Sequence, residues 1–145
     1  MVLAFIVPYL KQENKINMKR VTGLGGAFFK AKDPKALAAW YEKHLGINFG
    51  GNTYGVLFWD EDPKPDKRGT TVFSVFPDNT EYFAPSNNAF MFNLRVENLD
   101  WLLGTLKTEG VQVMDDTQTM EGIGKFGWIV DPEGNKVELW EPAKA

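Results

Sequence analysis

The sequence predicts an α+β fold of two modules, each with the order strand–helix–strand–strand–strand. The helix-capping signals repeat about 65 residues apart, with Asp33 matching Asn98 and Gly46 matching Gly110. In both halves the hydrophobic period also changes from about two residues to about 3.6 after the first strand. Because one helix covers only one face of each sheet, the other face must curl around a cavity or meet a partner. We therefore expect one cupped, mixed sheet.

The first module is expected over about residues 20–78. VTGLGGAFFKA alternates loosely, as in a strand weakened by glycines. Asp33 is a good helix N-cap, and Pro34 suits the first helical position, where the N–H that it lacks has no partner in any case. The strands NTYGVLFWD and TTVFSVFPD follow the helix. Between Pro34 and the closing Gly46, apolar residues recur at helical spacing: Leu37, Trp40, Tyr41 and Leu45.

The second module is expected over about residues 89–142, after a linker of about residues 79–88. NAFMFNLRV is its first predicted strand, Asn98 caps its helix, and Gly110 ends that helix. The last three strands are VQVMDD, KFGWIVD and KVELWEP. One apolar stripe runs along the helix: Leu99, Leu102, Leu103 and Leu106.

The composition argues against several functions. The chain of 145 residues has no cysteine, which excludes disulfides, thiolate metal sites and a cysteine nucleophile, and which fits the cytoplasm. The net charge of −3 implies no basic face, so no nucleic-acid partner is expected. The aromatic share of 14% suits a core and also a small-molecule pocket.

Residues 1–17 precede the first predicted strand. Their apolar part, MVLAFIVPYL, is too short to span a bilayer, and Pro8 is poorly placed for a helix. We interpret these residues as an N-terminal arm or a mis-assigned start, and residues 18–145 as a single domain. No membrane partner is expected.

Three stretches carry a resemblance to a known superfamily. They are KDPKALAAWYEKHLG in the first module, and RVENLDWLLGTLKTEG and DPEGNKVELWEP in the second. With these stretches the chain resembles the vicinal-oxygen-chelate superfamily, which holds glyoxalase I, bleomycin-resistance proteins and extradiol dioxygenases. The resemblance covers about residues 20–142. It implies the glyoxalase/bleomycin-resistance-like fold, a divalent metal in the cup with four ligand positions, and a homodimer.

The resemblance puts those four positions at Gly26, at or next to Ser74, at Met91 and at Glu138. Gly26 has no side chain, and a methionine thioether does not suit Mg, Mn, Fe or Zn. His44 is the only histidine of the chain, and it falls on the first predicted helix, outside the cup. Because one carboxylate does not make a metal site, we expect no metal and no other cofactor.

The cup is expected to be lined by aromatic side chains and a few polar groups. If Glu138 faces the cavity, strand alternation puts Lys136 and Trp140 on its face and turns Val137 and Leu139 toward the helix. The same argument on the other strands gives the candidate ligand-binding residues: Phe28, Trp59, Ser74, Met91, Asn93, Trp128, Glu138 and Trp140.

Three functional hypotheses follow. The first is a cytoplasmic homodimer that binds a small aromatic or cationic organic molecule without a complete metal site, as the bleomycin-resistance-like branch does. The second is a lyase, isomerase or dioxygenase-type enzyme that uses Glu138 as base or metal ligand. The third is a structural or interaction module with a filled cup. In a purely structural role, Glu138 is expected to be satisfied by Lys136, Arg95 or a backbone amide.

Overall fold

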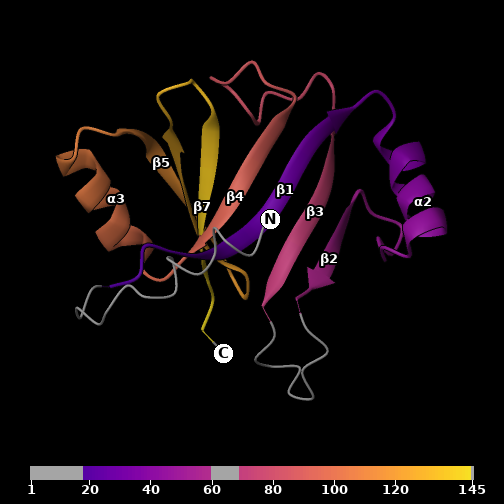
Figure 1. Ribbon diagram of the computed structural model, residues 1–145, viewed down its shortest axis with the longest axis horizontal. Coiled ribbons are helices and arrows are strands. Elements are labelled where there is room, and N and C mark those ends of the chain that lie inside the picture. The colour runs from indigo at the N-terminus through magenta and orange to yellow at the C-terminus, as the bar shows by residue number, and fades with distance from the viewer. Residues whose placement is uncertain (1–17, 60–68, 145) are drawn as a thin grey trace, which may run out of the picture.

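The computed structural model describes residues 18–59 and 69–144, which form seven strands and two helices. In chain order the elements are β1 (Val21–Ala31), α2 (Pro34–Leu45), β2 (Tyr54–Phe58), β3 (Thr70–Pro77), β4 (Phe90–Val96), α3 (Leu99–Thr108), β5 (Gln112–Met120), β6 (Gly124–Val130) and β7 (Lys136–Pro142). All seven strands join one sheet in the order β2-β3-β1-β4-β7-β6-β5. The helices α2 and α3 lie near its two ends (Figure 1).

The two halves of the sheet share one pairing scheme. In the first half, β1 pairs in parallel with β3, which pairs antiparallel with β2. In the second half, β4 pairs in parallel with β7, which pairs antiparallel with β6. The antiparallel pair β1–β4 joins the halves. The predicted mixed sheet of two modules is therefore confirmed.

The first module differs from the expected order, because its described residues form three strands rather than four. No strand forms between α2 and β2, where Gly50 and Gly51 have φ angles of 55° and 80°. This left-handed backbone cannot continue a strand. Phe49, only 3% exposed, turns into the core beside α2 instead. Residues 60–68 and the expected arm, residues 1–17, lie outside the described residues.

Both helices begin where the capping signals predict. The Asp33 side chain accepts a hydrogen bond of 2.9 Å from the backbone N–H of Ala36, and the Asn98 side chain accepts one of 3.0 Å from that of Trp101. At the other end of α2, Gly46 takes the left-handed conformation with φ of 69°. No helix among the described residues is long and apolar enough to cross a membrane.

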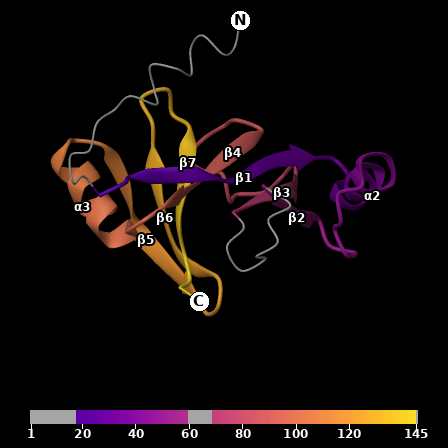
Figure 2. The same cartoon turned by 60° about the horizontal axis from the view of Figure 1, so that its bottom comes forward.

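The sheet buries a cluster of apolar side chains on each face. On the helix side, α3 packs Leu99, Leu102 and Leu103 against Val96 and Leu139, and α2 packs Ala38 near Val75. On the opposite, concave side lies a third cluster: Phe28, Phe83, Met91 and Trp128. Figure 2 shows α2 and α3 at opposite ends of the molecule with the strands between them. Phe83 belongs to the chain segment between β3 and β4, so this segment covers part of the concave side.

Candidate functional site

Glu138 lies in the middle of β7, on the face turned away from α3. Strand register pairs it with Trp128 on β6 and with Asn93 on β4, and it pairs Asn93 in turn with Gly26 on β1. Its neighbour Leu139 packs against α3 on the other face, as strand alternation predicts. The Glu138 residue is only 2% exposed. A carboxylate thus occupies the centre of the concave face.

Three side chains donate hydrogen bonds to this carboxylate. Asn93 Nδ2 lies 2.6 Å from Oε1 of Glu138, and Trp128 Nε1 lies 2.8 Å from Oε2. The hydroxyl of Tyr82 also donates to Oε2. A buried charge is tolerated when donors of this kind replace water. The three donors therefore explain how Glu138 stays inside the protein.

Tyr82 stays a donor because its phenol holds its proton. Burial, together with the charge and the hydrogen bond of Glu138, raises the pKa of Tyr82 well above its usual value. The pair is thus a neutral phenol on a residue that is 36% exposed and a carboxylate that is buried.

The segment between the modules, residues 78–89, fills one end of the cup. The ring of Tyr82 stacks on Phe76 with centroids 5.5 Å apart and planes 7° from parallel. Phe83 is fully buried, and its ring contacts Phe76 edge-on at 5.1 Å. Phe28, Met91 and Trp128 are the concave-side residues of the same buried cluster. This end of the cup is therefore packed core, as the third functional hypothesis expected for the cup as a whole.

Lys136 lies on the same face of β7 as Glu138 and is only 8% exposed. Its Nζ donates a hydrogen bond of 2.6 Å to the backbone carbonyl of Tyr82. The same atom lies 5.0 Å from the ring centroid of Tyr82 and 5.3 Å from that of Trp128. Burial lowers the pKa of Lys136, and the charge of Glu138 opposes this only in part. Neither Lys136 nor Arg95 donates to Glu138, so the side-chain partners expected from the sequence were wrong.

A cavity of about 400 Å³ opens beside this group, between residues 78–89 and β5. Two of the Glu138 donors, Tyr82 and Trp128, form part of its wall together with Lys136. Its full lining is Tyr82, Met114, Asp116, Thr117, Gln118, Trp128 and Lys136. The cavity is thus the open remainder of the cup.

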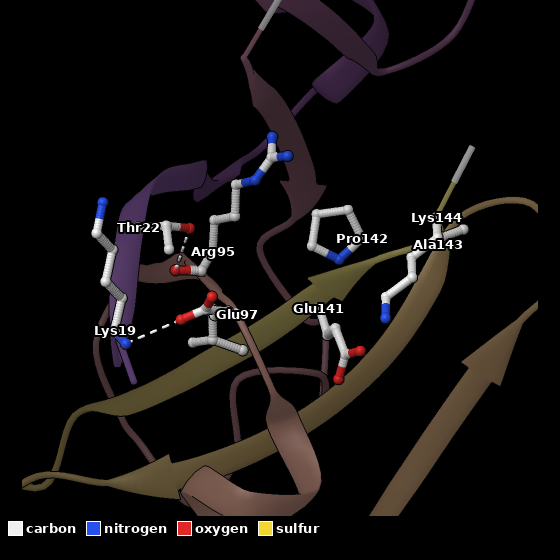
Figure 3. Close-up of a pocket in the computed structure, with 9 residues that line it drawn as sticks. Lys19, Thr22, Arg95, Glu97, Glu141, Pro142, Ala143 and Lys144 are labelled. Carbon is white, nitrogen blue, oxygen red and sulfur yellow. Dashed lines mark hydrogen bonds between the residues drawn. The ribbon is translucent and has the colours of Figure 1, made fainter. Parts of the chain in front are cut away.

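A second cavity, of about 460 Å³, lies at the ends of β1, β4 and β7 (Figure 3). Its two carboxylates already serve the fold. Glu97 accepts a hydrogen bond of 2.8 Å from the backbone N–H of Lys19, and Glu141 accepts one of 2.8 Å from that of Leu99 at the start of α3. Most of its lining residues are polar, and it shares none of them with the group around Glu138.

The structure separates two of the expected cup residues from the rest. Trp59 follows β2 by one residue. Its Nε1 donates to Thr71 Oγ1 at 2.6 Å, and its ring lies against Gly69 and against Gly23 of β1. It does not line the cavity beside Lys136, and its expected place in the cup stays a prediction. Trp140 is on the concave side but stacks on Phe126, away from the cavity of Lys136.

The other expected residues lie on the concave face, mostly as buried core. Phe28, Met91 and Trp128 pack with Phe83, and Ser74 is 8% exposed. Asn93, 3% exposed, orients Glu138, and its Oδ1 is buried without a hydrogen-bond partner. Of the eight expected residues, Trp128 is the one that lines the cavity of about 400 Å³.

The residues around Glu138 do not fit the divalent metal that the resemblance implies. Its neighbours in the register, Asn93 and Gly26, offer one amide and no side chain, and both carboxylate oxygens already accept hydrogen bonds. His44 lies on α2 against Trp40, with ring centroids 4.8 Å apart. Within residues 18–59 and 69–144, no group of three His, Asp or Glu side chains converges. A hard cation has too few donors here.

Comparison with known proteins identifies the family. A family model described as a glyoxalase-like domain matches residues 26–140. The chain belongs to the glyoxalase-like family. Membership confirms the superfamily predicted from DPEGNKVELWEP and the other two stretches. No curated protein matches this glyoxalase-like chain.

Several solved structures share the fold of this glyoxalase-like protein. Methylmalonyl-CoA epimerase from Mycobacterium tuberculosis is 18% identical with a TM-score of 0.58, over 93% of this chain and 96% of that one. The Streptomyces coelicolor methylmalonyl-CoA epimerase is 14% identical with a TM-score of 0.62, over 86% and 99%. A glyoxalase/bleomycin resistance protein/dioxygenase superfamily member from Vibrio splendidus is 12% identical with a TM-score of 0.51, over 85% and 98%. At these identities the similarity shows the fold alone.

Sequence reasoning missed the residues that matter most in this glyoxalase-like site. Tyr82 and Phe83 fall in the expected linker, and Lys136 was placed on the correct face but not among the site residues. The signal that points to the linker is its aromatic pair in TEYFAP, since an exposed linker rarely carries two large rings.

Proposed function

We propose that this glyoxalase-like protein binds a small aromatic molecule in the cavity beside Tyr82, Trp128 and Lys136. The observation that carries the proposal is the wall itself, in which two aromatic rings and a buried amine face a space of about 400 Å³. Small-molecule pockets are of this size, and they combine apolar walls with a few fixed polar groups. The open cavity favours ligand binding over the hypothesis of a completely filled cup.

The wall supports an aromatic ligand that carries a hydrogen-bond acceptor. Tyr82 and Trp128 offer ring surfaces, against which planar compounds gain more than their buried area alone. Lys136 is the only Lys or Arg of the lining and is buried, so it disfavours the cationic ligand that was the other expectation. A carbonyl or carboxylate oxygen suits the Lys136 amine.

Glu138 acts in this proposal as a positioning residue. Its carboxylate holds the Tyr82 hydroxyl and the Trp128 Nε1, and so fixes the orientation of two cavity walls. Asn93, which is not part of the lining, helps to hold the carboxylate. The contacts with ligand then come from Tyr82, Trp128 and Lys136.

The enzymatic alternative has one observation in its favour. The neutral phenol of Tyr82 and the carboxylate of Glu138 form a proton donor–acceptor pair at the edge of the cavity. A general base must reach the proton that it removes. Glu138 is 2% exposed and already accepts three hydrogen bonds, so little of its carboxylate is open to a substrate. A Glu138→Gln variant that stays folded and keeps ligand affinity supports the positioning role.

Ligand binding is tested by titration with three matched compounds. Benzoate, phenyltrimethylammonium and cyclohexanecarboxylate differ in charge and planarity. We expect benzoate to quench tryptophan fluorescence and to raise the melting temperature, since a ligand that binds only the folded state stabilises it. The other two compounds should bind at least about tenfold more weakly. Equal responses to all three compounds, or none, contradict the proposal.

The matched variants are Trp128→Leu and Trp101→Leu. Trp101 lies on α3 and is 38% exposed, so it reports the general effect of losing a tryptophan. Only Trp128→Leu should weaken benzoate binding, by about tenfold or more. Circular dichroism confirms that both variants are folded. If Trp128→Leu binds benzoate with unchanged affinity, the ligand does not bind in this cavity and the proposal is contradicted.

The homodimer stays a prediction. Light scattering coupled to size-exclusion chromatography measures it, and a monomer at micromolar concentration contradicts it.

A further inference from the structure

Lys136 is a buried amine that lines a cavity. It is 8% exposed, yet it belongs to the wall of the space of about 400 Å³. One N–H donates to the Tyr82 carbonyl at 2.6 Å. The rest of the amine is surrounded by the rings of Tyr82 and Trp128, with centroids at 5.0 and 5.3 Å. A lysine in such a place lacks the water that normally stabilises its charge.

No carboxylate within residues 18–59 and 69–144 forms an ion pair with this amine. The two ion pairs among the described residues are Arg20–Glu109 and Lys125–Asp100. Glu138 is two residues away on the same face, but its oxygens are held by Tyr82, Asn93 and Trp128. The charge of Glu138 raises the pKa of Lys136, but burial lowers it by more, and no hydrogen bond joins the two side chains. Asp116 is the remaining acidic group of the lining, and it is exposed to solvent.

We propose that Lys136 captures an aldehyde in this cavity as an imine. The inference rests on the proposed function and names the chemical class of its ligand. Desolvated lysines beside apolar walls are the ones that form Schiff bases with carbonyl compounds. An aromatic aldehyde combines the ring that suits Tyr82 and Trp128 with the carbonyl that suits Lys136.

The reaction balances without any oxidant, reductant or metal. The lone pair of neutral Nζ forms a bond to the carbonyl carbon, and the C=O π pair moves to oxygen, which takes up a proton as nitrogen gives up its first proton. The carbinolamine then forms the C=N bond as nitrogen gives up its second proton and the hydroxyl leaves as water. Amine and aldehyde thus give imine and one water.

The surroundings of Lys136 favour this sequence at neutral pH. Burial lowers the pKa of the Lys136 ammonium, which increases the neutral fraction that can attack. Donation to the Tyr82 carbonyl uses one N–H and leaves the lone pair free. Asp116, on the solvent side of the lining, is placed to exchange protons with water.

The experiment traps the imine with benzaldehyde and cyanoborohydride at pH 7. The reagent delivers hydride to the C=N carbon, so each trapped site gains the mass of the aldehyde less one oxygen atom. Peptide mapping should find the adduct at Lys136 about tenfold faster than at exposed lysines. Lys136→Arg keeps a cation and a donor for Tyr82 but forms no imine, so it should lose the fast adduct. Lys35→Met, an exposed position on α2, should retain it.

The inference and the proposed function fail in different ways. Benzoate binding measured by fluorescence, with benzaldehyde adducts spread evenly over exposed lysines, overturns the imine and leaves the binding site standing. If the wild-type protein does not bind benzoate and shows no preferred adduct, both the imine and the binding site are overturned. A fast adduct that persists in Lys136→Arg also overturns the inference, because another lysine then carries it. Circular dichroism of Lys136→Arg shows whether the loss of adduct comes from unfolding, and benzoate affinity gives a second check.

Discussion

The phenol of Tyr82 donates a hydrogen bond to the carboxylate of Glu138, 56 residues further along the chain. This bond ties the segment between the modules to the centre of the second module. Tyr82 also lines the cavity of about 400 Å³, so the bond holds one wall of that space. Without it, the carboxylate keeps two of its three donors, and the segment keeps the Lys136 hydrogen bond and the buried ring of Phe83.

Tyr82→Phe removes this bond and leaves the ring in place. Glu138 then keeps two donors, and the lost one leaves a buried charge less well satisfied. We expect the free energy of unfolding to fall by about 1–3 kcal/mol. Urea denaturation measures the change. Tyr54→Phe is the matched control, because Tyr54 on β2 is 51% exposed and should lose almost nothing. Equal stability of the two variants contradicts the role given to Tyr82.

Phe83→Ala tests whether residues 78–89 form part of the core. Phe83 is fully buried among Phe28, Met91 and Trp128, and its truncation leaves a cavity. We expect a loss of about 3–5 kcal/mol, the usual cost of truncating a buried phenylalanine. Phe90→Ala, at a position 41% exposed, should cost far less. If Phe83→Ala is as stable as Phe90→Ala, the segment does not fill the cup.

Asp131 gives the turn before β7 a dependence on pH. Its carboxylate accepts hydrogen bonds from the backbone of Glu133 and from the side chain and backbone of Asn135, and the Asn135 side chain contributes most to lowering the pKa of Asp131. Because its folded pKa lies below its unfolded pKa, this carboxyl stabilises the fold above the unfolded pKa. That contribution is lost as pH falls through the folded pKa.

Asp131→Asn should therefore be less stable than the wild type at pH 6, and the gap should narrow as pH falls below about 4. Urea midpoints at a series of pH values measure the gap. A gap that stays constant down to the acid limit shows that Asp131 acts through packing rather than charge. The turn also meets the segment between the modules, since Asn88 donates to the Asn135 side chain.

The fold was readable from the sequence because its signals are local. Asp33 and Gly46 mark the ends of one helix, Asn98 starts the other, and alternation along KVELWEP puts Leu139 on the helix side and Glu138 on the concave side. Each of these inferences depends on neighbours a few residues away. The fourth strand of the first module was expected only from the repeat in order, without residues of its own, and the described residues of that module form three strands.

The site was less readable because its contacts are long-range. No residue near Tyr82 in the chain indicates that its hydroxyl bonds to Glu138. In the same way, no residue near Lys136 indicates that its amine bonds to the Tyr82 carbonyl. Trp59 shows the same limit, because it lies beyond the end of β2 and its ring meets Thr71 and Gly23 from other strands. Strand parity therefore fixed the face of Glu138 but not what covers it.

The central claim is that an aromatic ligand contacts Trp128 in the cavity beside Lys136. The most direct measurement is a two-dimensional ¹H–¹⁵N spectrum of the five tryptophan Nε1–H groups during titration with benzoate. The Trp128 resonance, identified by its absence in Trp128→Leu, should shift in a saturable way, while those of the exposed Trp40 and Trp101 stay in place. An unmoved Trp128 resonance, or saturable shifts confined to Trp40 or Trp101, would contradict the claim.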